Sequence, residues 1–218
     1  MKKILIMGAG GTALNVIDLL LHEQNIFQPI GVIDPIAQGD ILGVPVLGND
    51  EILPIIKEKL GVKHIFPAVG FGDNVNNTLR KKLYNKAKKH NYKIPNIISK
   101  NAFVRYGVEM GEGNLVQAGS ILDTKSILGN NINIGLNVAI GHKSEIHNHV
   151  TIAGSVNING GVIIGEGTFL GMSCSIYKNV GSWCKISPSV STLKAVPDNS
   201  IVFGQSVRII NNFQMKNN

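Results

Sequence analysis

The chain has 218 residues, enough for one large or two small domains, and its 21 Lys and Arg against 14 Asp and Glu give a formal net charge of +7. No run of about eighteen apolar residues occurs, so we expect no transmembrane helix, and glycines interrupt the apolar start that superficially resembles a secretory signal. Cys174 and Cys184 form no CxxC motif or disulfide framework, which favours a cytoplasmic protein with a buried free thiol at Cys174. The positive charge either serves a soluble surface or attracts anionic small molecules.

Residues 1–95 alternate between segments typical of strands and of helices. We expect strands at Lys3–Met7, Pro29–Ile33, His64–Val69 and Tyr92–Ile94, and helices at Thr12–Glu23, Asn49–Lys59 and Asn76–His90. Such alternation indicates a small parallel sheet with helices on its faces. We therefore predict an α/β, half-Rossmann-like domain over residues 1–95.

The last of these helices carries a dense run of cations: Arg80, Lys81, Lys82, Lys86, Lys88 and Lys89. Apolar Leu79, Leu83 and Ala87 recur at helical spacing among them. This pattern predicts an amphipathic helix whose cationic face lies in solvent. Because few aromatic residues accompany the cations, we expect no nucleic-acid partner.

A glycine-rich loop follows the first predicted strand. Gly8-Ala9-Gly10-Gly11-Thr12-Ala13 satisfies G-x-G-x-x-G/A, and Asp34 ends the second predicted strand. Such glycines let a backbone approach phosphates at a helix N-terminus. Only about half of a doubly wound fold fits before the next domain, so a mononucleotide-type site is favoured over an NAD site. A tight strand–helix turn without a ligand is the third interpretation.

A strict six-residue repeat of aliphatic side chains dominates the second half of the chain. It comprises Val104, Met110, Val116, Leu122, Leu128, Ile134, Ile140, Ile146, Ile152, Ile158, Ile164, Leu170 and Ile176. Neither a helix nor an ordinary strand has this period, whereas a hexapeptide β-helix does. If three hexapeptides make one triangular turn, residues eighteen apart stack, so that Ile140, Ile158 and Ile176 form one column.

The repeat changes after Ile176, where Ser182 and Pro188 occupy the expected aliphatic positions. Val180, Ile186 and Thr192 predict a shifted final coil instead. We therefore predict an all-β domain over residues 96–218 that ends in a C-terminal cap. Trp183 is expected either to cover the core there or to contact a ligand.

The combination of these features resembles one group of bacterial sugar acyltransferases, the sialic-acid O-acetyltransferases and nucleotide-4-amino-sugar N-acetyltransferases. The resemblance covers nearly the whole chain and lies in KKILIMGAGGTALNVIDLL (2–20), VIDP (32–35), AVGFGDN with LRKKLY (68–84), IPNIISKNAFV (94–104) and VFGQSVRII (202–210). It implies a left-handed parallel β-helix, a homotrimer, and active sites in the clefts between subunits. It also implies that the small domain binds the nucleotide of a nucleotide-linked amino sugar and that acetyl-CoA lies along the cleft.

The resemblance also assigns binding residues. Gly8, Gly10, Gly11 and Thr12 would face the phosphates, Asp34 would contact the nucleoside, and Gly70 would flank the same site, although Thr12 replaces a common histidine of the group. On the acetyl-CoA side, Thr151, Gly160 and Met172 match positions along the pantetheine path, and Lys194 and Arg208 lie where the 3′-phosphate is expected.

His142 matches the catalytic histidine of the group. An amino sugar is mostly ammonium at neutral pH, and a histidine can accept the proton that must leave before the amine attacks a thioester. The carboxylates that usually flank this histidine are replaced by Gly141 and Lys143, and a second histidine of the group by Thr151. Three interpretations follow: Glu145 or a neighbouring subunit orients His142, positioning supplies most of the catalysis, or the site is a relic.

A zinc site is the alternative role for the histidines of the repeat. Prism-fold carbonic anhydrases use three histidines, and His142 and His147 have the required spacing of five. Tyr106 occupies the third position, and catalytic zinc usually takes three protein ligands. We therefore expect no metal.

The sequence thus predicts a homotrimeric acetyl-CoA-dependent N-acetyltransferase that acts on a nucleotide-linked amino sugar for a surface polysaccharide. Transfer to a sugar hydroxyl or from another acyl-CoA is the first alternative. A catalytically silent nucleotide-sugar-binding or scaffold protein is the second, because Gly141 and Lys143 replace the usual carboxylates.

Overall fold

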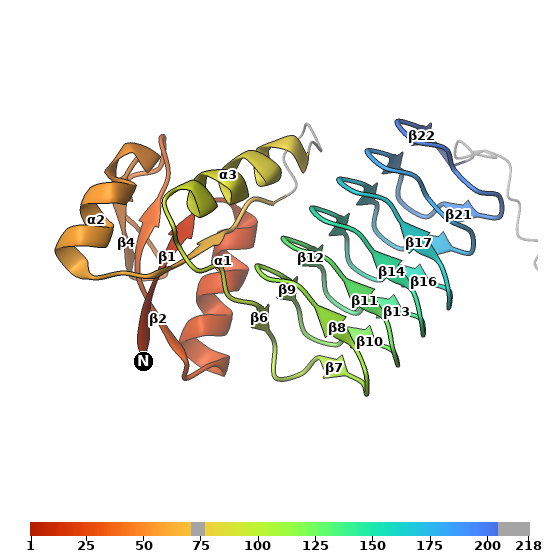
Figure 1. The fold of residues 1–218 in the computed structure, drawn as a ribbon, viewed down its shortest axis with the longest axis horizontal. Coiled ribbons are helices and arrows are strands. Elements are labelled where there is room, and N and C mark those ends of the chain that lie inside the picture. The colour runs from red at the N-terminus through yellow and green to blue at the C-terminus, as the bar shows by residue number, and fades with distance from the viewer. Residues whose placement is uncertain (71–76, 205–218) are drawn as a thin grey trace, which may run out of the picture.

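The computed structural model describes residues 1–70 and 77–204. An α/β part forms one end of the molecule, and a three-sided prism of short parallel strands extends away from it (Figure 1). The predicted order of the two architectures is confirmed. No helix within the described ranges is long and apolar enough to cross a bilayer.

The α/β part is built on one sheet in the order β3-β4-β2-β1-β5. Its strands are β1 (Lys2–Met7), β2 (Phe27–Ile33), β3 (Asp40–Ile41), β4 (Val44–Gly48) and β5 (His64–Pro67). Its helices are α1 (Gly11–Asp18), α2 (Leu53–Leu60) and α3 (Asn77–Lys89). A π-helical turn over Leu19–Glu23 continues α1, and a 3₁₀ turn over Asp50–Ile52 precedes α2. All pairs are parallel except the β3–β4 hairpin, which the sequence analysis missed. The strand expected at Tyr92–Ile94 is absent among the named strands; Lys93 forms only an isolated bridge to His64.

Alternate residues of the central strand β1 enter two different cores. Ile4 and Ile6 pack with α1 on one side of the sheet, and Leu5 and Met7 pack with α2 and α3 on the other. A parallel strand covered on both faces needs this continuous apolar run. The α1-side core also includes Ile97 and Leu115, so it continues directly into the prism.

The prism has three faces. The first face holds β6 (Ile97–Ile98), β9 (Leu115–Val116), β12 (Asn133–Ile134), β15 (Thr151–Ile152), β18 (Phe169–Leu170), β20 (Lys185–Ile186) and β22 (Ile201–Val202). The second holds β7 (Phe103–Val104), β10 (Ile121–Leu122), β13 (Ala139–Ile140), β16 (Asn157–Ile158), β19 (Ser175–Ile176) and β21 (Ser191–Thr192). The third holds β8 (Glu109–Met110), β11 (Ile127–Leu128), β14 (Glu145–Ile146) and β17 (Ile163–Ile164).

The six-residue repeat places one aliphatic residue at the end of every strand from β7 to β19. Ile140 pairs with Ile158 and Ile158 with Ile176, so the predicted column is confirmed. From Val116 to Ile176 these side chains are buried in one continuous core. The corner residue three positions after a strand is often in the left-handed conformation, as Asn131, Lys143 and His149 are, which explains the many Asn, Gly and Ser residues there.

The last coils are shorter than the others. Strand partners lie eighteen residues apart up to Ile176, but Phe169 pairs with Lys185 and Lys185 with Ile201, sixteen residues apart. The shifted coil predicted from Val180, Ile186 and Thr192 is therefore confirmed. The predicted cap falls largely outside the described residues.

Candidate functional site

A cavity of about 1090 Å³ opens at the carboxyl ends of β1, β2 and β5. This end of a parallel sheet is where open α/β folds bind ligands. Its wall includes all six residues expected to bind the nucleotide sugar: Gly8, Gly10, Gly11, Thr12, Asp34 and Gly70. Helix α3 closes one side, and Gln117 of the prism closes another.

The glycines of the loop after β1 have different roles. Gly8 has a φ of +102°, and a Cβ there would lie 3.0 Å from the Ala68 carbonyl oxygen, so a side chain would strain the backbone and crowd the strand end. A Cβ at Gly10 or Gly11 would meet nothing within 4 Å. Their backbone therefore borders the open cavity at the start of α1, where the first N–H groups of a helix lack helical acceptors.

Asp34 links the glycine loop after β1 to the segment that follows β2. Its Oδ2 accepts a hydrogen bond from Ala9 N at 3.0 Å, and its Oδ1 accepts from Ile36 N and Ala37 N, both at 2.9 Å. Burial opposes ionisation, but the three backbone donors outweigh it and hold the pKa of Asp34 below its ordinary value. The carboxylate thus shapes the loop and presents negative charge to the cavity.

Thr12 and Gly70 pack against each other. Thr12 is buried, and a Cβ at Gly70 would lie 2.6 Å from the Thr12 hydroxyl oxygen. Gly70 therefore lets the chain after β5 pass close over the start of α1.

Lys82 supplies a cation to the cavity wall. Its side chain is exposed, and it has no ionic partner among the described residues. Asp50, another wall residue, is already paired with Lys86. A diphosphate bound at the glycine loop would therefore find Lys82 free to pair with it.

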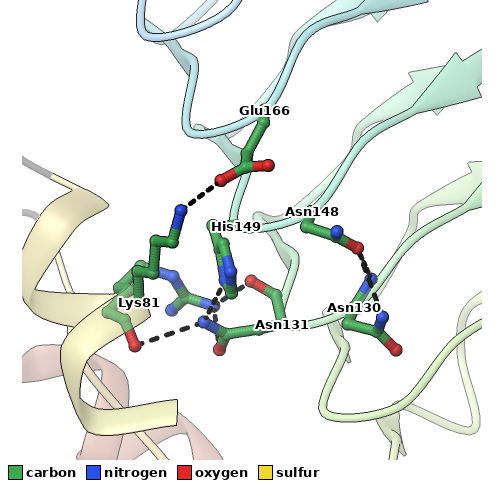
Figure 2. A network of polar contacts seen from close by, with 7 residues as sticks. Lys81, Asn130, Asn131, Asn148, His149 and Glu166 are labelled. Carbon is green, nitrogen blue, oxygen red and sulfur yellow. Dashed lines mark hydrogen bonds and ion pairs between the residues drawn. The ribbon is translucent and has the colours of Figure 1, made fainter. Parts of the chain in front are cut away.

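Helix α3 packs against the corner of the prism between its third and first faces, where Lys81 pairs with Glu166 (Figure 2). The sequence analysis had expected the cationic face of this helix to lie in solvent. Arg80 is buried with 2% exposure; its Nη1 donates to the Val69 carbonyl at 3.0 Å, and its Nη2 donates to Asn131 O at 2.8 Å and Oδ1 at 3.1 Å. Burial lowers the pKa of Arg80 to about 10. The expectation that this cation faces solvent is wrong, because the prism covers it.

His149 belongs to the same interface. Its Nδ1 lies 2.9 Å from Asn131 Nδ2, which must be the donor, and the Tyr84 ring packs edge-on against it. Burial is the main cause that lowers the pKa of His149 to about 4. Among the residues that the structure describes, no group of three His, Cys, Asp or Glu side chains is placed to hold a metal ion.

Thr151 faces α3 within this subunit. Its hydroxyl donates to Asn77 Oδ1 at 2.7 Å, while Asn77 Nδ2 donates to the carbonyls of Gly167 and Thr168. Thr151 is buried, so the expected contact with pantetheine would require its hydroxyl to leave Asn77. Thr151 therefore belongs to the contact between α3 and the prism in this subunit, and its contact with pantetheine stays a prediction.

His142 lies at the corner between the second and third faces, and its side chain is exposed. A Cβ at Gly160 would lie 2.6 Å from His142 Nε2, so the imidazole lies directly over this glycine of the next coil. No carboxylate of residues 1–70 or 77–204, Glu145 included, forms an ion pair with His142. The structure therefore brings His142 and Gly160 together but leaves the imidazole without an orienting partner inside the described subunit.

The other expected cofactor residues are dispersed. Met172 is exposed at the corner between the first and second faces, and Lys194 is exposed on the last coils. Arg208 lies outside the described residues. Between the two corners, a groove of about 290 Å³ crosses the second face beside Gly141 and Tyr177.

Sequence reasoning missed Gln117 and the inward role of Arg80. Gln117 could have been noticed in the sequence, because the residues after the other first-face strands from β6 to β20 are small: Ser99, Gly135, Ala153, Gly171 and Ser187. Arg80 carried no such signal, since its burial depends on contacts fifty residues away in the chain.

Comparisons with known proteins agree with this arrangement. Residues 3–87 match the family model of the PglD N-terminal domain. A perosamine N-acetyltransferase of Caulobacter crescentus, solved with CoA and GDP-perosamine, is 28% identical with a TM-score of 0.84, and the match covers 94% of each chain. The acetyltransferase domain of PglB from Neisseria gonorrhoeae, solved with acetyl coenzyme A, is 24% identical with a TM-score of 0.83 over 93% of this chain and 96% of that one. WeeI from Acinetobacter baumannii is 22% identical with a TM-score of 0.77 over 96% and 100%. No curated protein matches the chain.

Proposed function

Because the chain is a sugar acetyltransferase of the hexapeptide-repeat family, with a PglD-type N-terminal domain and a left-handed β-helix, we propose that it transfers acetyl from acetyl-CoA to the amine of a nucleotide-linked amino sugar. The observation that carries this proposal is the cavity in which the glycine loop, Asp34 and Lys82 face the prism. The Caulobacter relative, which matches both parts of the chain, was solved with a nucleotide-linked amino sugar and CoA. The polysaccharide that receives the sugar is a cell-surface glycan in this proposal.

In the proposed mechanism, His142 is the general base. Its neutral imidazole takes a proton from the sugar ammonium, and the freed amine attacks the thioester carbonyl. The backbone N–H of Gly160, beside the imidazole, has no acceptor among the described residues and would donate to the developing oxyanion. Collapse of the intermediate breaks the carbon–sulfur bond; the sulfur takes the proton held by the His142 imidazolium and CoA leaves as the thiol, while the new amide nitrogen gives its extra proton to the freed imidazole.

The positions of the two half-sites favour an oligomer. The cavity reaches the prism at Gln117, at the corner between the first and second faces, whereas His142 lies at the opposite edge of the second face. We therefore propose a homotrimer in which His142 of one subunit serves the cavity of its neighbour. Such a site also accounts for the absence of an orienting partner for His142 in the described part of one subunit.

Acetyl-CoA as donor also implies the cytoplasm. The two cysteines, both free and buried, are compatible with a reducing compartment.

The reaction is tested by incubating the protein with acetyl-CoA and a panel of UDP-, dTDP- and GDP-linked amino sugars, with products identified by mass spectrometry. We expect one amino sugar to gain an acetyl group on nitrogen. Acetylation on oxygen would move the reaction to the hydroxyl, and binding without transfer would favour a silent binding protein.

The shared site is tested by mixing two inactive variants, His142→Ala and Gly10→Glu. The open space around Gly10 accommodates the new side chain, whose carboxylate repels a diphosphate. Random mixing of subunits should restore about a quarter of the sites, those that combine an intact His142 with an intact cavity. No recovery in co-expressed mixed trimers would place both half-sites within one subunit.

A further inference from the structure

Gln117 interrupts a column of small residues along one corner of the prism. The residue that follows each first-face strand is Ser99, Gly135, Ala153, Gly171 or Ser187 from β6 to β20, except after β9, where it is Gln117. The exception occurs on a coil that contacts the α/β part: Leu115 of β9 lies in the α1-side core. A long polar side chain is therefore present where the cavity meets the prism.

The side chain of Gln117 lines the cavity and is 9% exposed. Its backbone groups take part in the coil, with Gln117 N donating to Ile134 O and Gln117 O accepting from Ser120 N. Its side-chain amide has no hydrogen-bond partner among residues 1–70 and 77–204. Neither amide atom is fully enclosed, so the unpaired amide is open to the cavity and available to hydrogen-bond a group bound there.

The chemistry of the surrounding wall narrows the identity of that group. The N–H groups of the glycine loop and the Lys82 ammonium are donors, which suit the oxygens of a diphosphate, whereas the Asp34 carboxylate of the same wall already accepts three backbone N–H bonds. Gln117 offers both a donor and an acceptor, which suits a hydroxyl, since a hydroxyl also does both. Beyond the diphosphate of a nucleotide sugar, the next such groups belong to the hexose.

We propose that Gln117 hydrogen-bonds a hexose hydroxyl of the nucleotide-linked amino sugar and so positions the sugar as it leaves the cavity for the prism. This inference rests on the proposed function. It assigns to the prism, through one side chain, a share of the recognition that the α/β part otherwise performs. Gln117 acts here as a positioning residue and takes no proton.

The assignment is tested by calorimetric titration with two ligands. One is the nucleotide-linked amino sugar that the protein acetylates, in its unacetylated form, and the other is the matching free nucleoside diphosphate. In Gln117→Leu we expect the Kd of the nucleotide sugar to rise about tenfold, because one or two hydrogen bonds are lost, while the Kd of the nucleoside diphosphate changes less than about twofold. Gln117→Asn, which keeps the amide, should recover part of the loss. Gln28→Leu, an exposed glutamine on β2 outside the cavity, is the matched control and should change neither Kd.

Each other outcome overturns the inference. Equal weakening of both ligands would place Gln117 against the nucleotide or its phosphates, and no change in either would remove it from the binding site. If the unaltered protein binds the nucleotide sugar no more tightly than the nucleoside diphosphate, then no residue of the protein contributes binding energy through the sugar. That result identifies a failure of the proposed function rather than of Gln117 alone.

Discussion

The two halves of the candidate site differ in how complete they are within one subunit. The cavity is lined by β1, β2, the segment after β5, helices α1 and α3, and the prism, and Asp34 fixes its loops by three hydrogen bonds. The corner at His142 has an exposed imidazole over a glycine and no orienting carboxylate among the described residues. Under the proposed function, this difference makes nucleotide binding a property of one folded subunit, whereas transfer depends on the groups that a neighbouring subunit brings to the corner at His142.

The strongest test of this separation is His142→Ala. We expect kcat to fall by about a hundred- to ten-thousandfold, because the amine loses its proposed general base. The Kd of a nucleoside diphosphate should stay unchanged, since His142 lies outside the cavity wall. His147→Ala, an exposed histidine five residues away, serves as the control and should retain activity. A parallel loss of nucleotide binding would contradict the separation into two half-sites.

Arg80 connects the segment beside the cavity to the prism, and its removal should destabilise the half of the site that is complete within one subunit. Arg80→Ala leaves the carbonyls of Val69 and Asn131 and the amide oxygen of Asn131 without their donor and opens a void. We expect a loss of about 3 kcal/mol in the free energy of unfolding, measured in urea. Lys82→Ala on the exposed side of the same helix should change stability by less than about 0.5 kcal/mol. Equal effects of the two would mean that the interface contributes no stability.

Acid should loosen the same interface through His149. Its pKa is about 4 in the folded protein, below the ordinary value of 6.5, so the unfolded chain binds the proton more readily between these values. The folded state should therefore lose about 2 kcal/mol of stability between pH 7 and pH 5, and the loss continues until the pH falls below about 4. His149→Asn tolerates the left-handed backbone and keeps an acceptor for Asn131 without titrating. Its unfolding curves should show this dependence removed, and an unchanged slope would assign the titration to another group.

The smallest expected effect concerns the charge of the cavity. Lys82→Ala should weaken binding of a nucleoside diphosphate about threefold to fivefold at low salt, since the cation is exposed. The difference from the unaltered protein should shrink as the ionic strength rises. Lys89→Ala, on the same helix but outside the cavity, is the control. A loss that is insensitive to salt would indicate that Lys82 acts by packing rather than by charge.

The prism was predictable because its physics is local and repetitive. A period of six fixes which side chain faces the core, and Ile140 and Ile158 stack as expected from their spacing. The glycine loop was predictable for a similar reason, since Gly8 reports a backbone conformation that other residues rarely adopt.

The docking of the two parts was not predictable in this way. Arg80 lies in the same run of cations as Lys82, which is exposed, and nothing in that run sets it apart. Only its contact with Asn131, about fifty residues further along the chain, explains its burial. The β3–β4 hairpin was missed because its first strand has only two residues, too few to show a period. The assignment of Thr151 depended on resemblance alone, whereas its burial depends on where α3 lies.

The number of residues in a coil also limits which insertions can lengthen the prism. Up to Ile176, strand partners are eighteen residues apart, and neighbouring strands are spaced about 4.8 Å. Inserting one complete coil between Gln117 and His142 would lengthen the distance between them along the prism axis by about that spacing and keep every ladder intact. Inserting one or two residues would instead turn core side chains outward unless a corner absorbed them. The coils after Ile176, whose strand partners are sixteen residues apart, show that a coil can instead lose two residues and keep its pairing. The distance between Gln117 and His142 along the prism axis can therefore change in evolution only in steps of about one strand spacing.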